Sequence, residues 1–185
     1  MKNRIFYIPG WMNTLGTYGN PSGMEIWDGG FDLDADIDSV CVVGHSMGAN
    51  FTLINRARRG EGKIILVNPL FPRRNLFVWY IRLKLFHLKE GKNGNAEHAK
   101  GWRNFFCGIR NAARILSFDP RDLLEKIPKE DIVVVRGRGD EFLCNEKAVD
   151  FIRGFGIELI EVDGSGHRWD GNIQKTVDKL LESWI

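Results

Sequence analysis

Three residues with side chains suited to nucleophilic catalysis are spread along the chain: a serine, Ser46, an aspartate, Asp140, and a histidine, His167. Each follows a short run of β-branched and aliphatic residues of the kind that forms a buried strand. A serine hydroxyl is a weak nucleophile on its own, and it becomes reactive when a histidine that is oriented by a carboxylate removes its proton. The combination predicts acyl transfer, with Ser46 as nucleophile, His167 as general base and Asp140 as the orienting acid.

Ser46 is the centre of a Gly-x-Ser-x-Gly motif at 44–48. A strand-like run at 39–44 precedes the motif and helix-forming sequence follows it, which is the order of a nucleophile elbow. Such a turn forces the serine into a tight backbone conformation and exposes it at the strand's carboxyl end. We expect Gly44 and Gly48 to be required because a Cβ at either position would collide with the neighbouring strand or helix.

Strand-like and helix-like segments alternate along most of the chain. We expect strands at 4–8, 39–44, 63–67, 131–136 and 157–162, a short extended piece at 24–27, and helices at 49–59, 120–126, 145–153 and 172–184. This alternation predicts right-handed crossovers and a parallel sheet that is covered on both faces. Chemistry gathers at the carboxyl ends of such strands, so the three candidate residues should meet along one edge.

The segment 70–118 differs from the rest of the chain in pattern and in charge. Phe77, Ile81, Leu85 and Leu88 recur at helical spacing, which predicts an inserted helical cap that is broken at 91–94. The segment holds ten Lys or Arg against two acids, a net +8, so the remainder carries −6 because the whole chain is +2. We therefore expect a single domain over 1–185 with the basic cap, 70–118, within it.

The acid and the histidine each have competing interpretations. Glu141 lies next to Asp140 in sequence, and Asp163 and Asp170 lie in or close to the loop 163–167, here called the histidine loop. Asp140 is favoured over them because it follows the end of its expected strand. His167 could instead be a plain loop histidine, although its Gly-rich loop after a strand favours the catalytic interpretation. His45 is interpreted as structural or as part of the rim of the site.

The three motifs together resemble those of the α/β-hydrolase superfamily. Gly-His-Ser-Met-Gly at 44–48, Gly-Arg-Gly-Asp at 137–140 and Gly-Ser-Gly-His at 164–167 occur in the superfamily's Ser, Asp, His order. The resemblance implies a reduced α/β-hydrolase fold with about six parallel strands and a helical cap inserted after the fourth strand. It also implies an oxyanion hole made by the backbone N–H groups of Met47 and Trp11.

The cap is expected to set the substrate, since the catalytic residues do not distinguish what is attached to the carbonyl. Its aromatic residues suggest an acyl channel and its basic residues suggest an anionic partner, and the substrate-binding candidates are Trp79, Phe105, Phe106, Arg73 and Arg74. Pro-Gly-Trp at 9–11 together with a basic helical cap is similar to the carrier-protein methyl esterases of biotin synthesis. This similarity implies a carrier-linked acyl ester on an anionic carrier protein, whereas the alternative is a solvated basic face over a small-ester pocket.

Composition limits the remaining classes. At 43% hydrophobic and 27% charged, the chain has the composition of an ordinary globular protein, and no apolar run exceeds the six residues 76–81, so no transmembrane segment is expected. The three cysteines are widely spaced, so we expect neither a metal site nor a disulfide framework, no cofactor, no nucleic-acid partner, and a cytoplasmic location. The leading prediction is a serine hydrolase that acts on a carboxylic ester or thioester. The alternatives are a catalytically inactive binding protein of the same fold and a peripheral membrane lipid esterase whose basic, aromatic cap lies on anionic lipid.

Overall fold

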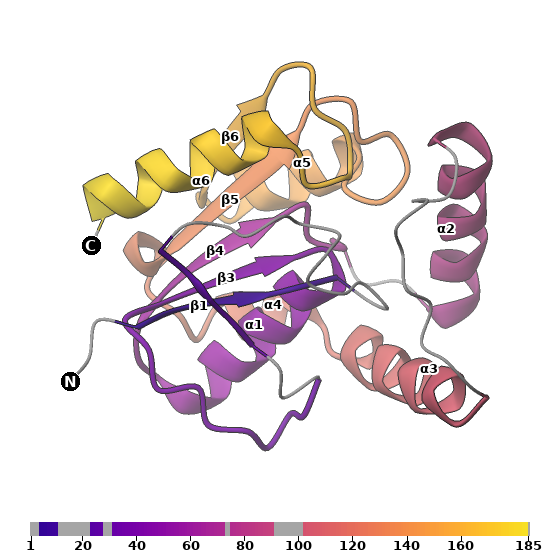
Figure 1. Ribbon diagram of the computed structural model, residues 1–185, viewed down its shortest axis with the longest axis horizontal. Helices are drawn as coiled ribbons and strands as arrows, with labels where there is room; N and C mark the ends of the chain where they lie inside the picture. The colour runs from indigo at the N-terminus through magenta and orange to yellow at the C-terminus, as the bar shows by residue number, and fades with distance from the viewer. Residues whose placement is uncertain (1–3, 11–22, 28–30, 73–74, 91–101, 185) are drawn as a thin grey trace.

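A single six-stranded sheet forms the centre of the protein (Figure 1). The computed structural model describes residues 4–10, 23–27, 31–72, 75–90 and 102–184. The strands are β1 (Ile5–Ile8), β2 (Glu25–Ile26), β3 (Cys41–His45), β4 (Lys63–Val67), β5 (Ile132–Gly137) and β6 (Glu158–Val162). Their order is β2-β1-β3-β4-β5-β6 and every neighbouring pair is parallel. The predicted sheet of about six parallel strands is confirmed.

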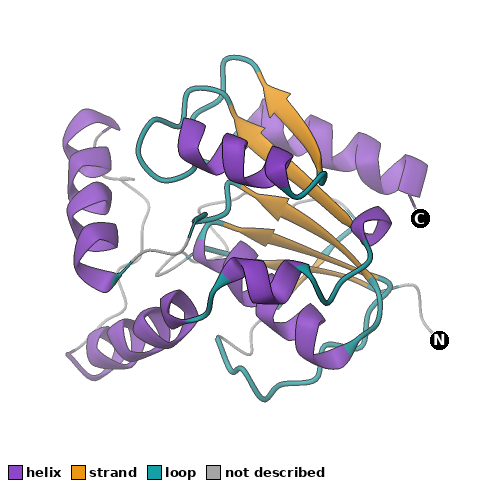
Figure 2. Cartoon of the chain, turned by 180° about the vertical axis from the view of Figure 1, so that it is seen from behind, coloured by secondary structure: helices purple, strands orange, loops and turns teal. Residues whose placement is uncertain are grey.

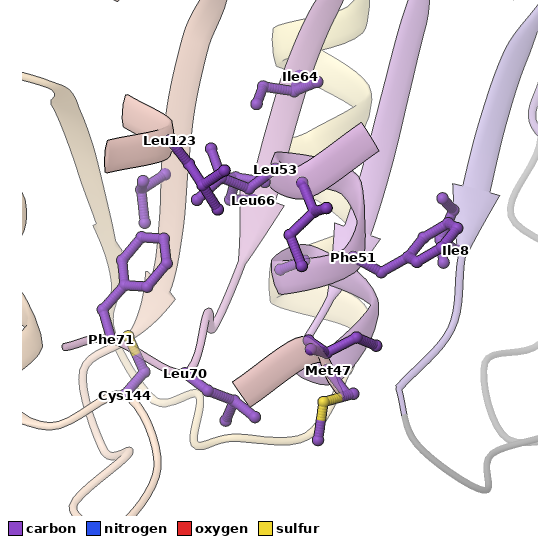
Figure 3. Packing of buried hydrophobic residues seen from close by; sticks show 14 of the residues in the cluster. Ile8, Met47, Phe51, Leu53, Ile64, Leu66, Leu70, Phe71, Leu123 and Cys144 are labelled. Atoms are coloured by element: carbon purple, nitrogen blue, oxygen red, sulfur yellow. The ribbon is translucent and has the colours of Figure 1, made fainter. Parts of the chain in front are cut away.

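Helices cover both faces of the sheet. The helices of the described chain are α1 (Met47–Arg59), α2 (Leu76–Glu90), α3 (Trp102–Ser117), α4 (Pro120–Leu124), α5 (Glu146–Gly154) and α6 (Gly171–Trp184), with a 3-10 turn at Lys129–Asp131. Alternate residues of each strand point to opposite faces. One face packs against α1, α4 and α5, and the other packs against α6, as the opposite views show (Figure 2). Figure 3 shows Leu53 of α1 beside Leu66 of β4, and Phe51 of α1 beside Ile8 of β1, in the larger core.

Local sequence explains where α4 begins and where α1 ends. Asp119 caps α4 because its side chain accepts the Arg121 N–H at 3.0 Å, and Pro120 occupies the first helical position, as predicted. α1 ends at Gly60, whose φ of 87° allows its N–H to reach the Arg56 carbonyl at 3.0 Å. α1 begins two residues earlier than expected, directly after Ser46.

The inserted segment contributes α2 and α3, which lie between β4 and β5 in sequence and beyond the carboxyl ends of the strands in space (Figure 1). This placement after the fourth strand agrees with the predicted position of the helical insertion. Trp79 and Phe86 of α2 are buried in the larger core. Among the described residues, no helix is both long enough and apolar enough to cross a membrane.

Candidate active site

The serine lies in a tight turn between β3 and α1. Ser46 has φ 55° and ψ −119°, a conformation that residues other than glycine rarely adopt, and its N–H donates to the Val67 carbonyl at 2.8 Å. A Cβ on Gly44 would come within 2.4 Å of Thr52 Oγ1, and one on Gly48 would come within 2.4 Å of the Ile8 carbonyl oxygen. The expected collisions with the helix and the neighbouring strand are confirmed, so both glycines are needed to form this turn.

The structure brings the three candidate side chains together in one row of hydrogen bonds. His167 Nε2 lies 2.9 Å from Ser46 Oγ, and His167 Nδ1 lies 2.5 Å from Asp140 Oδ2. Asp140 and His167 are both buried, at 1% and 5% exposure, so bulk water competes little for these bonds. With the imidazole neutral, Nδ1–H donates to the carboxylate, which leaves Nε2 free to accept the serine proton. This is the arrangement that general-base activation of a hydroxyl requires.

Asp140 is held as an anion by His167 and by the loop that follows the acid. Its carboxylate accepts the backbone N–H groups of Phe142, Leu143 and Cys144 at 3.2, 2.9 and 2.8 Å. Burial alone would raise the pKa of Asp140, but attraction to His167, the hydrogen bond from its ring and the N–H groups of Leu143 and Cys144 outweigh it and lower the pKa to about 2. The carboxylate is therefore charged at neutral pH and can stabilise an imidazolium cation.

The competing carboxylates have other partners. Glu141 is exposed and pairs with Lys89 at 2.6 Å, and Asp163 pairs with Arg138 at 2.7 Å. Asp170 accepts the Ser165 hydroxyl at 3.0 Å and caps the start of α6. Of the four carboxylates, Asp140 is the one bonded to the imidazole.

One of the two predicted oxyanion donors can be placed. Met47 is the first residue of α1, so its backbone N–H is among the donors that a helix leaves without an intrahelical partner. The helix dipole adds a partial positive charge at the same point, which favours a developing oxyanion. Trp11, the second predicted donor, lies outside the described residues.

Asn68 is a positioning residue that the sequence did not single out. Its side chain is fully buried and its φ is 46°. Its amide Nδ2 donates to the carbonyls of Gly166 and His167 at 3.1 and 2.9 Å, and its Oδ1 accepts the Gly137 N–H at 2.9 Å. One side chain therefore joins the end of β4, the end of β5 and the histidine loop. The available signal was an asparagine directly after a strand, at Asn68-Pro69.

His45 also holds the histidine loop, through a hydrogen bond to its backbone. It is buried, and its Nε2 lies 2.8 Å from the His167 carbonyl, which can only accept, so Nε2 carries the proton. Burial, followed by repulsion from His167, lowers the pKa of His45 to about 3. His45 is therefore neutral. Of the two roles considered for it, the structural one fits this burial, whereas a place on the rim does not.

A buried guanidinium holds the acid loop. Arg136, 1% exposed, donates through Nε to the Cys144 carbonyl at 2.7 Å and pairs with Glu146 and Glu161, each at 2.7 Å. The loop between Asp140 and α5 is thereby fixed to the end of β5. A charged residue at the end of an otherwise apolar strand was the only hint of this role in the sequence.

The substrate-binding candidates are only partly described. Trp79 is buried at 3% exposure inside the larger core. Phe86, from the same helix, places its ring edge-on to the His167 ring at 5.5 Å between centroids, a contact that the sequence did not reveal. The remaining candidates are Phe105 and Phe106, which lie on α3 with side chains outside the described set, and Arg73 and Arg74, which lie outside the described residues. Their role in substrate binding stays a prediction.

Comparison with known proteins identifies the fold. No protein-family model matches the sequence, and no curated protein is significantly similar to it. Among solved structures, an N-formylmaleamic acid deformylase from Pseudomonas putida S16 superposes with a TM-score of 0.64 at 16% identity, covering 95% of this chain and 91% of that one. An esterase from Pyrococcus furiosus superposes with a TM-score of 0.60 at 15% sequence identity, covering 98% of this chain and 82% of that one. A structure described for carboxylesterases of Nitrososphaera gargenis superposes with a TM-score of 0.58 at 12% sequence identity, covering 98% of this chain and 88% of that one. The chain has the α/β-hydrolase fold.

Proposed function

We propose that this protein is a serine hydrolase that cleaves a carboxylic ester or thioester through an acyl-enzyme intermediate on Ser46. The observation that carries the proposal is the hydrogen-bonded row from Asp140 through His167 to Ser46, built at a strained turn between a strand and a helix. The names of the structural neighbours, esterases and a deformylase, support the hydrolase class.

The chemistry proceeds in two halves. Ser46 Oγ attacks the carbonyl carbon while His167 Nε2 takes the hydroxyl proton, and Asp140 stabilises the resulting imidazolium. The Met47 N–H stabilises the oxyanion, which collapses as the leaving alcohol or thiol takes the proton from His167. Water then attacks the acyl-serine, with His167 as base, to release the carboxylic acid and restore the serine.

An inactive binding protein is the second class, and the geometry argues against it. A strained Ser46 and a buried charged Asp140 both cost free energy, and a binding surface elsewhere on the fold would need neither. The proposal that the acyl group is linked to an anionic carrier protein rests only on the basic inserted segment and on the sequence similarity at 9–11. The proposal of a reducing, cytoplasmic location rests on the sequence, whose three widely spaced cysteines suggest no disulfide framework.

Pre-steady-state kinetics test the proposal. With p-nitrophenyl acetate, we expect a burst of p-nitrophenolate that approaches one equivalent per protein, followed by slower turnover, because acylation precedes hydrolysis. Parallel assays with matched butyryl esters and butyryl thioesters then identify the preferred leaving group. The absence of turnover on every short ester and thioester would favour the binding-protein class.

A further inference from the structure

The outer surface of α2 carries a stripe of large apolar side chains. Phe77, Ile81, Leu85 and Leu88, here called the outer stripe, are 71%, 41%, 45% and 82% exposed. Their spacing of four, four and three residues places them along one side of the helix. Among the described residues, the large hydrophobic side chains that are exposed all lie on α2. Such a contiguous patch is the usual mark of an interaction surface.

The opposite side of α2 already attaches the helix to the protein. Trp79 and Phe86 are buried in the larger core, and Arg82 donates to the Phe142 carbonyl at 3.0 Å. Lys89 pairs with Glu141 at 2.6 Å in the acid loop. A surface helix needs one apolar face to cover a core, so the outer stripe is a second apolar face that is not required for packing.

Exposed basic side chains lie on α2 and on its neighbour α3. Lys84 is exposed on α2 itself, and Arg110 and Arg114 are exposed on α3, which lies at the same end of the molecule (Figure 1). Residues 70–118 carry a net +8, whereas the rest of the chain carries −6. An anionic surface would therefore attract the exposed basic residues of α2 and α3, which orients the molecule with α2 toward the surface.

We propose that the outer stripe docks this protein on an anionic lipid surface. The apolar side chains enter the boundary between headgroups and acyl chains, and the Lys and Arg residues around them contact lipid phosphates and carboxylates. Because Phe86 of the same helix contacts the His167 ring, docking would place the candidate active site next to the lipid surface. The proposal goes beyond ester hydrolysis and does not depend on it.

Two other occupants fit less well. A second copy would bring two segments of charge +8 together, and one helix of 15 residues, about 22 Å long, offers far less area than the roughly 800 Å² per partner of a stable dimer. An acidic carrier protein would satisfy the basic residues but would not itself require Phe77 and Leu88 to be so exposed. A lipid surface accommodates both features and requires no complementary shape.

Vesicle flotation tests the docking surface. The wild-type protein should float with phosphatidylcholine vesicles that contain roughly one-third phosphatidylserine, and far less with phosphatidylcholine alone, because charge and insertion act together. Phe77→Ser with Leu88→Ser should weaken binding roughly tenfold or more, and Lys84→Glu with Arg114→Glu should do the same. The matched control is Lys126→Glu with Lys147→Glu, which makes the same charge change on the body of the protein and should leave binding within about twofold.

Turnover of a soluble short ester separates docking from unfolding, because the Phe77 and Leu88 variant and the Lys84 and Arg114 variant should both keep wild-type activity and helical circular dichroism. Ser46→Ala should float like the wild type, so failure of the hydrolase proposal leaves this test intact. No flotation, equal flotation with neutral vesicles, or wild-type flotation of the Phe77 and Leu88 variant would overturn the proposal. Sedimentation that shows a dimer dissociated by that variant would overturn it in favour of a second copy.

Discussion

The carboxyl edge of the sheet and the outer face of α2 are built in opposite ways. At the edge, buried polar side chains such as Asn68, Asp140 and Arg136 tie one loop to another through hydrogen bonds of defined direction. Across α2, apolar packing on the inner side fixes the helix and leaves the outer side chains in solvent. Directional bonds hold atoms where chemistry needs them, whereas nondirectional apolar contact allows the outer surface to change without moving the site. Substitutions at the edge should therefore reduce turnover, and substitutions on the outer stripe should not.

The largest expected effect is at the nucleophile. Ser46→Ala removes the attacking oxygen and should lower kcat for p-nitrophenyl butyrate by roughly 10⁴-fold to 10⁶-fold. The backbone conformation is unchanged by this substitution, so Tm should stay close to that of the wild type. Turnover that survives in a protein freed of contaminating esterase would show that the edge of the sheet is not the site of chemistry.

Loss of the orienting acid should come next. Asp140→Asn keeps the shape but removes the counter-charge of the imidazolium and favours the wrong imidazole tautomer, so kcat should fall by roughly 10³-fold to 10⁴-fold. Glu141→Gln is the matched control, because Glu141 is exposed and pairs with Lys89, and it should cost far less. A larger loss of kcat for Glu141→Gln than for Asp140→Asn would show that Glu141, and not Asp140, is the orienting acid.

The role of Asn68 gives a smaller effect that sharpens the comparison. Asn68→Gly keeps a backbone that tolerates positive φ but removes the bonds to Gly137, Gly166 and His167. We expect kcat to fall by roughly tenfold to a hundredfold, with a smaller change in KM, because the imidazole is held less accurately. Asn75→Ala also removes an asparagine side-chain hydrogen bond, here at the start of α2, where Asn75 Oδ1 accepts the Val78 N–H at 2.8 Å. This variant should leave kcat unchanged. Equal effects of the two variants would deny Asn68 a positioning role.

The smallest effect concerns stability and pH. The pKa of His45 is about 3 in the folded protein and about 6.5 when unfolded, so between these values the unfolded chain binds more protons. The folded state therefore loses stability as pH falls through this window, by about 2 kcal/mol for this residue between pH 7 and pH 5. Urea unfolding at both pH values should show a smaller loss for His45→Gln than for the wild type. The same loss in both proteins would contradict a buried neutral His45.

Much of the architecture was predictable because it depends on local sequence. The apolar run, glycine spacing and helix-forming residues around Ser46 determine a strand, a turn and a helix within a dozen residues. Alternation of strands and helices then predicts a parallel sheet, and the shared carboxyl edge predicts that Ser46 and His167 approach one another.

The supporting bonds were not predictable because they join residues far apart in sequence. Asn68 reaches Gly166 and His167 across 98 and 99 positions, and nothing local indicates which loop its amide will bind.

The faces of α2 were ambiguous for a different reason. The helix is apolar on both sides, so periodicity correctly predicts a helix but cannot tell that the stripe starting at Phe77 faces solvent while Trp79 and Phe86 face the core.

Covalent labelling tests the central claim most directly. A fluorophosphonate reacts with an activated serine, so intact-mass analysis should show one adduct per chain, and peptide mapping should place it on Ser46. Ser46→Ala should not be labelled, and Asp140→Asn should be labelled much more slowly because its base is no longer oriented. An adduct on a different residue, or equal labelling of the wild type and Ser46→Ala, would contradict the assignment of Ser46 as the nucleophile.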